Sequence, residues 1–153
     1  MVVTEAIGWG EFVEREPELA QFGASRLLSA PSYLATVRAS GAPRVHPVTL
    51  IFTDSGMFLF MEPTSPKGRD LRERGWFALH NGVPDEAGSG GEFHVSGRGL
   101  PIDDGETWSE VAEAASYVPA DRYVLFELQV SEALCKAYGD VALPSTRKWS
   151  VIP

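Results

Sequence analysis

The stretch that decides the fold is Tyr33-Leu34-Ala35-Thr36-Val37-Arg38-Ala39-Ser40-Gly41-Ala42-Pro43-Arg44-Val45-His46-Pro47-Val48. Residues 33–38 fit a strand whose side chains alternate between two faces, and Ser40-Gly41 is typical of a hairpin turn. The returning strand is expected over residues 44–52. After a second turn signal at residues 53–56, the apolar run 57–61 has the length of a third strand. Three strands joined by short turns indicate an antiparallel meander.

Helices and further strands are expected on both sides of this meander. A helix is predicted over about residues 11–30, with its main part starting near residue 16 because Pro17 suits a first turn. Two more helices are predicted at residues 66–74 and 104–115. Further strands are expected at residues 76–80, 92–101, 123–130 and 134–138, followed by an irregular tail at 140–153 in which a short terminal strand is possible around Trp149. The pattern predicts one domain over residues 1–153, mainly β with peripheral helices, built as a six- to seven-stranded antiparallel barrel.

Composition narrows the class of protein. The chain has 153 residues, 44% of them hydrophobic, and a net charge of −8. The negative charge argues against nucleic-acid or anionic-membrane partners. No apolar run reaches the roughly 18 residues of a membrane span, and residues 1–5 show no leader pattern, so a cytoplasmic location is expected. Cys135 is the single cysteine and is interpreted as a small packing residue.

A candidate anion site lies at the start of the helix predicted at residues 66–74. Hydroxyls from Thr64 and Ser65 would lie beside the unpaired N–H groups of the first turn. Lys67 and Arg69 add positive charge, and Gly68 lets a ligand approach the backbone. Together these residues predict a phosphate cradle. The alternative is a capped helix with a basic surface.

Two strands carry further candidate binding residues. Arg44 and His46 share one face of the second strand, where Arg44 is placed to reach the same phosphate. The alternatives are a surface arginine and a packing histidine. On the later strand, Glu92 and His94 share a face that lines a ligand groove or meets solvent. Because His46, His80 and His94 lack metal-ligand spacing, no metal site is predicted. No G-x-S-x-G elbow is present, and no residue is assigned a catalytic role.

Five segments together match the order and spacing of a known family: Tyr33-Leu34-Ala35-Thr36-Val37-Arg38, Pro43-Arg44-Val45-His46-Pro47-Val48, Gly56-Met57-Phe58-Leu59-Phe60, Thr64-Ser65-Pro66-Lys67-Gly68-Arg69-Asp70-Leu71 and Phe93-His94-Val95-Ser96-Gly97-Arg98. Over roughly residues 12–138 the chain resembles the pyridoxamine 5'-phosphate oxidase-related family of FMN-binding split β-barrels.

The resemblance implies a homodimer with two FMN sites at the subunit interface. The positions that hold the FMN phosphate in the family correspond to Arg44, Ser65 and Lys67. The strand residues that run along the flavin ring correspond to Val45, His46, Pro47 and Val48. Glu92 falls near the position from which the partner subunit reaches the flavin, where the oxidases have glutamine.

Two features set the chain apart from true pyridoxamine 5'-phosphate oxidases. Thr49 stands where they have a lysine for the substrate phosphate, and residues 145–149 lack the histidine of their C-terminal arginine–histidine pair. The leading hypothesis is therefore an FMN-dependent oxidoreductase acting on a different small molecule. Two alternatives stay open: a reductase using the deazaflavin F-420, and a non-enzymatic flavin- or haem-binding protein with His46 or His94 as an axial ligand. Further candidates to touch the cofactor or close its pocket are Arg147, Lys148 and Trp149.

Overall fold

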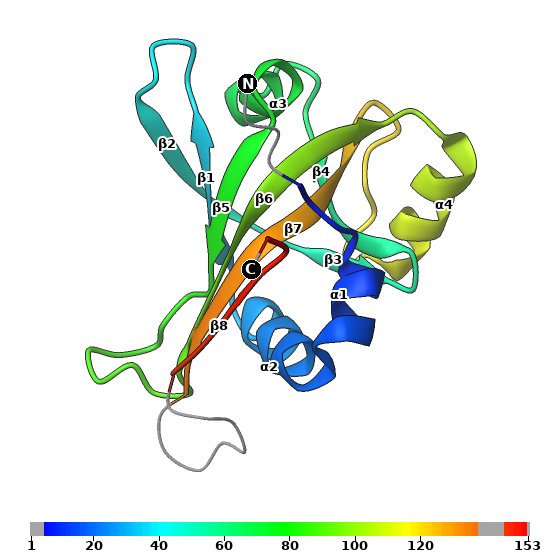
Figure 1. Cartoon of the computed structure of the whole chain (residues 1–153). Coiled ribbons are helices and arrows are strands. Elements are labelled where there is room, and N and C mark those ends of the chain that lie inside the picture. The colour runs from blue at the N-terminus through cyan, green and yellow to red at the C-terminus, as the bar shows by residue number, and fades with distance from the viewer. Residues whose placement is uncertain (1–4, 138–145, 153) are drawn as a thin grey trace.

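The computed structural model describes residues 5–137 and 146–152. In chain order, the elements are α1 (Trp9–Arg15), α2 (Pro17–Leu28), β1 (Ser32–Val37), β2 (Pro43–Val48), β3 (Ile51–Thr53), β4 (Gly56–Met61), α3 (Pro66–Glu73), β5 (Trp76–His80), β6 (Glu92–Ile102), α4 (Gly105–Ala114), β7 (Val124–Lys136) and β8 (Thr146–Ser150). The architecture is mainly β, with the helices around a curled antiparallel sheet, as the sequence predicted (Figure 1). None of the described helices is long and apolar enough to cross a membrane.

The order of the strands explains why the sheet curls. One hydrogen-bonded path runs β2-β1-β5-β6-β7-β4-β3, and β8 pairs with the second half of β7. β2 and β3 stand at opposite ends of this path, yet only Thr49 and Leu50 separate them along the chain. The two ends of the sheet must therefore approach each other, which gives a barrel-like curl rather than a flat layer.

Several boundaries differ from the sequence-based prediction. The strand expected over residues 44–52 is divided, because β2 pairs with β1 whereas β3 pairs with β4. The helix expected over residues 11–30 is also divided, because Glu16 leaves helical geometry (φ −137°, ψ 65°) and Pro17 begins a new helix. In the tail, residues 146–150 form β8 on β7, which agrees with the short strand considered around Trp149, whereas residues 140–145 lie outside the described part. The two strands expected at residues 123–130 and 134–138 form one continuous strand, β7, because both parts pair with β6. With this merger, the division at residues 49–50 and the presence of β8, the described part of the chain has eight strands instead of six or seven.

The core positions α3, which carries the candidate anion site. Phe93 and Phe126 are fully buried between the sheet and the helices. α3 then packs on β1, β5 and β6. The approach to β6 is close, since a Cβ at Gly99 would lie only 2.9 Å from Leu71 Cδ2. The N-terminal turn of α3 is thereby held beside β1 and the strand that pairs with it, β2.

The sheet face turned away from the core presents side chains in regular rows. One row crosses six strands and consists of Pro47, Tyr33, His80, His94, Leu134 and Lys148. Large apolar side chains remain exposed on this outer face of the chain, among them Tyr33, Val45 and Trp76. β2 ends the strand path on this side and contains two prolines, Pro43 and Pro47. The outer face is therefore a surface on which another molecule can pack.

Candidate functional site

The helix α3 begins where the sequence predicted. Ser65 is its N-cap, with φ −58° and ψ 126°, and Pro66 occupies the first turn. The Ser65 hydroxyl accepts a hydrogen bond from the backbone N–H of Gly68 at 3.5 Å. Thr64 precedes the cap and is exposed. The helix ends at Glu73, before Gly75 adopts φ +78°.

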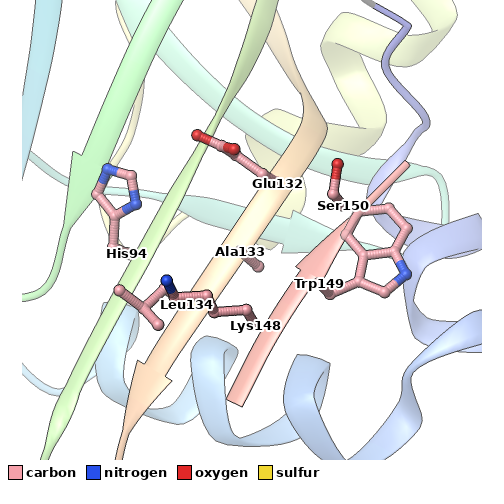
Figure 2. Close-up of a pocket in the computed structure, with 7 residues that line it drawn as sticks. All are labelled: His94, Glu132, Ala133, Leu134, Lys148, Trp149 and Ser150. Atoms are coloured by element: carbon pink, nitrogen blue, oxygen red, sulfur yellow. The ribbon is translucent and has the colours of Figure 1, made fainter. Parts of the chain in front are cut away.

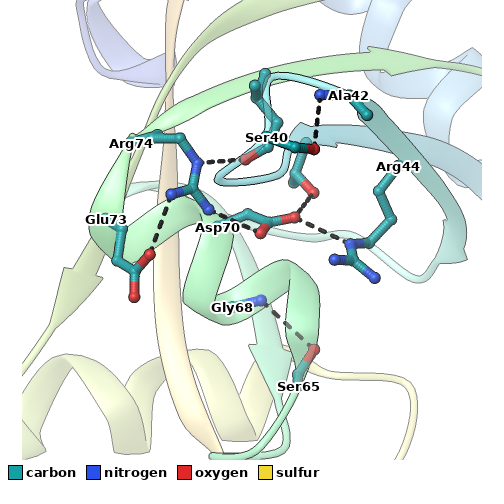
Figure 3. Close-up of polar contacts among 10 residues, drawn as sticks. Ser40, Ala42, Arg44, Ser65, Gly68, Asp70, Glu73 and Arg74 are labelled. Atoms are coloured by element: carbon teal, nitrogen blue, oxygen red, sulfur yellow. Dashed lines mark hydrogen bonds and ion pairs between the residues drawn. The ribbon is translucent and has the colours of Figure 1, made fainter.

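A buried carboxylate organises the basic residues near this helix. Asp70 Oδ2 accepts hydrogen bonds from Thr36 Oγ1 at 2.7 Å and from Arg44 Nε at 3.0 Å. Asp70 Oδ1 accepts from Arg74 Nη2 at 3.0 Å. The two arginines approach Asp70 from opposite sides (Figure 3). The network joins β1, β2 and α3, and it places the Arg44 guanidinium beside the helix that also carries Lys67.

Burial and the charges of this network shift the pKa values of three groups. Burial raises the pKa of Asp70, but the hydrogen bonds from Thr36, Arg44 and Arg74 outweigh burial and hold that pKa below its ordinary value. Burial also lowers the pKa of Lys67. The pKa of His46 is lowered by burial, then by the charges of Lys67 and Arg44, so His46 is neutral at pH 7. Arg44, His46 and Lys67 therefore share one electrostatic environment.

His46 has a further property of interest. Its Nε2 is buried and has no hydrogen-bond partner among the residues the structure describes. Buried polar atoms nearly always form hydrogen bonds. We therefore expect a water or a bound molecule to form a hydrogen bond with His46 Nε2.

A groove continues from Lys67 along the end of the barrel. Its volume is about 290 Å³. The groove is lined by Pro47, Val48, Thr49, Leu59, Phe60, Met61, Glu62, Lys67, Tyr117 and Tyr123. The lining combines aromatic and aliphatic side chains with the Lys67 ammonium group at the α3 end, the Thr49 hydroxyl, and the Glu62 carboxylate, which is paired with Arg122. Such a groove suits a flat apolar ring that carries an anionic group. Its volume is at the lower end for ligand sites, as expected if one chain contributes only part of the site.

The structure separates some of the residues that the sequence grouped as cofactor-binding. Val45 is 64% exposed on the outer face, opposite to Arg44 and His46. Gly68 faces the core, because a Cβ there would contact Met61 Sδ at 3.5 Å and not an approaching ligand. Arg69 is exposed on α3.

Glu92 lies far from the anion site within one chain. It begins β6, whereas α3 packs near Gly99, about 23 Å further along that strand at roughly 3.3 Å per residue. Its Oε1 is 3.4 Å from His80 Nε2. Within one chain Glu92 therefore does not reach the anion site.

A second hollow lies on the outer face. It has a volume of about 440 Å³ and is lined by His94, Glu132, Ala133, Leu134, Lys148, Trp149 and Ser150 (Figure 2). Burial and then the neighbouring His80 lower the pKa of His94, so its imidazole is neutral at pH 7. Trp149 also packs on Phe12, with ring centroids 4.9 Å apart. Arg147 is not directed to this hollow, because it forms ion pairs with Glu16 and Glu18.

Two kinds of site residue were missed at the sequence level. Asp70 lies within residues 64–71, but it was not predicted as a site residue. Its spacing of four residues from Arg74 on a helix does indicate an ion pair. Tyr117 and Tyr123 follow α4 and reach the groove through tertiary packing, for which the sequence gives no local signal.

Cys135 is fully buried and burial raises its pKa, in agreement with a packing role. Within the described ranges, no three His, Cys, Asp or Glu side chains are grouped to hold a metal ion.

Comparisons with known proteins agree with this fold. The family model for pyridoxamine 5'-phosphate oxidase matches residues 10–135. Among solved structures, the haem storage protein HutZ from Vibrio cholerae superposes with a TM-score of 0.57 at 21% identity, covering 76% of this chain and 89% of that one. A haem-binding protein from Mycobacterium smegmatis superposes with a TM-score of 0.65 at 16% identity, covering 87% of this chain and 57% of that one. A NimC/NimA family protein from Clostridium acetobutylicum gives 0.61 at 14% identity, covering 90% and 91%. No curated protein matches the sequence. At these identities the solved structures show the fold alone.

Proposed function

The chain belongs to the pyridoxamine 5'-phosphate oxidase family, and on this basis we propose that it binds FMN and acts as an oxidoreductase on a small molecule. The observation that carries the proposal is the continuity of the anion site with the groove. Lys67 lies in the first turn of α3 and lines the groove, whereas Arg44 is bonded to Asp70 on the same helix, and the charges of both act on His46. A phosphate fits the cationic end, and the flavin ring fits the apolar remainder.

Each part of the site has a role in this proposal. Arg44 and Lys67 would hold the phosphate through charge-assisted hydrogen bonds, with the backbone N–H of Lys67 in the first turn of α3 as a further donor, since Pro66 has no N–H and that of Gly68 bonds Ser65. Pro47 and Val48 would pack along the flavin ring, and Tyr117 would cover it from the opposite wall of the groove. The bound FMN would supply the hydride or electron chemistry, while the chain orients it and excludes water.

The substrate is proposed to differ from pyridoxamine 5'-phosphate. Thr49 lines the groove where the true oxidases have a phosphate-binding lysine. Arg147 is engaged by Glu16 and Glu18 rather than directed toward the groove. Of the two positions that would hold the phosphate of the substrate, Thr49 carries no charge and Arg147 is already paired with two glutamates.

We also propose that the working unit is a homodimer formed through the outer face. Exposed Tyr33, Val45 and Trp76 leave that face incompletely covered in one chain. The groove of one chain is small, and Glu92 is distant from its own anion site. A second copy packed on the outer face would enlarge the site and bring its Glu92 close.

Titration of the purified protein with FMN, riboflavin, F-420 and haem tests the cofactor. We expect saturable FMN binding, measured by quenching of flavin fluorescence, and at least tenfold weaker binding of riboflavin, which lacks the phosphate. Anaerobic NADH or NADPH should then bleach the visible flavin band. Absence of FMN binding contradicts the proposal, and tight binding of F-420 instead would identify the deazaflavin reductase.

Haem binding is a second candidate, favoured by the hollow beside His94. The imidazole of His94 is neutral and half-buried there, which is the form that ligates iron. His80 is less suited, because Asn81 O and Glu92 engage its two ring nitrogens. Two of the similar structures are described as haem-storage or haem-binding proteins. The test is the Soret band of the haem complex, which should be lost in His94→Ala and kept in His46→Ala. A band that survives both substitutions rules out ligation by either histidine.

A further inference from the structure

We propose that Asp70 is the positioning residue of the phosphate site: it holds Arg44 by Nε, so that the terminal amino groups of Arg44 face the bound phosphate. This inference rests on the proposed FMN function and adds to it a residue that does not itself touch the cofactor. The observation is the buried Asp70 network, in which a single carboxylate is shared by β1, β2 and α3 (Figure 3).

Arg44 contacts Asp70 through its Nε atom alone. A guanidinium has five N–H donors in a fixed plane. Asp70 takes the Nε–H, and no described residue accepts a hydrogen bond from the two terminal amino groups of Arg44. The Arg44 side chain is 21% exposed, whereas that of Asp70 is only 4% exposed. Arg44 is therefore fixed along one edge, and its two terminal amino groups are left to bind an anion.

The Asp70 carboxylate is itself held rigidly by its hydrogen-bond donors. Thr36 and Arg44 share Oδ2, and Arg74 takes Oδ1, so Asp70 has a partner at each oxygen. Arg74 is in turn engaged by Glu73 and by the backbone carbonyl of Val37. A carboxylate held from three elements cannot follow Arg44 if that side chain moves. The position of Arg44 is thus set by the fold before any ligand arrives, which lowers the ordering cost of binding.

The charge of Asp70 and its positioning of Arg44 have opposite effects on phosphate binding. Asp70 is an anion near a site for an anion, so removing its charge should strengthen phosphate binding by Coulomb attraction alone. Positioning predicts weaker binding despite the gain in positive charge. The two effects differ in sign, which allows one substitution to separate them.

The test is the affinity of Asp70→Asn for FMN and for riboflavin, measured by fluorescence quenching. An asparagine has one acceptor oxygen and an NH₂ group that cannot accept from Arg44 or Arg74. We expect FMN to bind about tenfold more weakly and riboflavin to bind as in the unaltered protein. FMN binding that is unchanged or tighter overturns the proposal, as does an equal loss for both flavins, which would show a purely structural role.

Two further variants keep the test decisive. Thr36→Val removes one donor to Oδ2 and keeps the charge of Asp70, so it should weaken FMN binding by about threefold without affecting riboflavin; it also serves if Asp70→Asn does not fold. Arg74→Gln removes the ion pair on the other oxygen but leaves the contact between Asp70 and Arg44, so it should lower the ratio of the two affinities less than Asp70→Asn does. A fall in that ratio equal to the one in Asp70→Asn would overturn a specific link between Asp70 and Arg44. If the unaltered protein binds no FMN, the proposed function itself fails, which distinguishes the two results.

Discussion

Replacing Arg44 by alanine should affect cofactor binding and stability together. On the binding side, the substitution removes a charge-assisted interaction with the phosphate, worth about 1.5–3 kcal/mol. At about 1.4 kcal/mol per tenfold change in Kd, FMN affinity should fall by roughly 10- to 150-fold. Riboflavin affinity should change little, because riboflavin has no phosphate for Arg44 to hold.

On the stability side, the same substitution deprives a buried carboxylate of one of its donors. Asp70 is 3% exposed and keeps only Thr36 and Arg74. Loss of a hydrogen bond to a charged group in such a place should lower the free energy of unfolding by about 1.5–3 kcal/mol. Urea unfolding followed by tryptophan fluorescence measures this quantity, and flavin fluorescence quenching measures the affinities.

Arg15→Ala is a suitable control for Arg44→Ala. It removes the same charge from an exposed ion pair with Glu11 on α1, remote from the anion site. Its FMN affinity should stay within about twofold of the unaltered protein, as is usual for an exposed charge. Unchanged FMN affinity in folded Arg44→Ala would refute the assignment of Arg44 to the phosphate. An equal loss of FMN and riboflavin would refute the division of the groove into a phosphate end and a ring end.

Three further predictions concern the fold. The folded pKa of Asp70 lies below its ordinary value of 3.8, so its stabilising effect is present above about pH 4 and is lost as pH falls toward the folded pKa; unfolding free energies of the unaltered protein and Asp70→Asn should converge on acidification. Gly97→Ala should destabilise the protein by about 3 kcal/mol in urea unfolding, because the new Cβ would lie 2.0 Å from the backbone oxygen of Gln129; a stability equal to that of the unaltered protein would contradict the close β6–β7 approach. Cys135 is fully buried with a raised pKa, so a thiol reagent should label it only after unfolding, and rapid labelling of the folded protein would disprove its burial.

Local patterns predicted the elements well and their pairings less well. Alternation along residues 92–98 gave the inward and outward faces of β6, and Pro66 with Ser65 gave the start of α3. The division between β2 and β3 was missed, because residues 44–52 have uniform strand character. Which of the two pairs with which neighbour depends on closing the sheet, and that is a long-range property.

The candidate site shows the same difference between local and long-range information. Charge and helix capping indicated Lys67 and Ser65, because these signals lie within a few residues. That Arg44 is tied to Asp70 follows from bringing β2 against α3, 26 residues apart in the chain. The aromatic wall at Tyr117 and Tyr123 depends on packing of the segment after α4. Sequence patterns thus located the cationic end of the groove and not its apolar remainder.

The two prolines of β2 restrict how copies of this chain associate. An edge strand normally offers free N–H groups to which a strand of another chain can add. Proline has no N–H, and alternate residues of a strand point their N–H groups to the same side, so Pro43 and Pro47 leave Val45 as the single donor along that side of β2. Growth of a continuous intermolecular sheet from this edge, as in fibril formation, is thereby blocked. The proposed homodimer uses instead the exposed side chains of the sheet surface, where contacts would close after two copies rather than repeat without end.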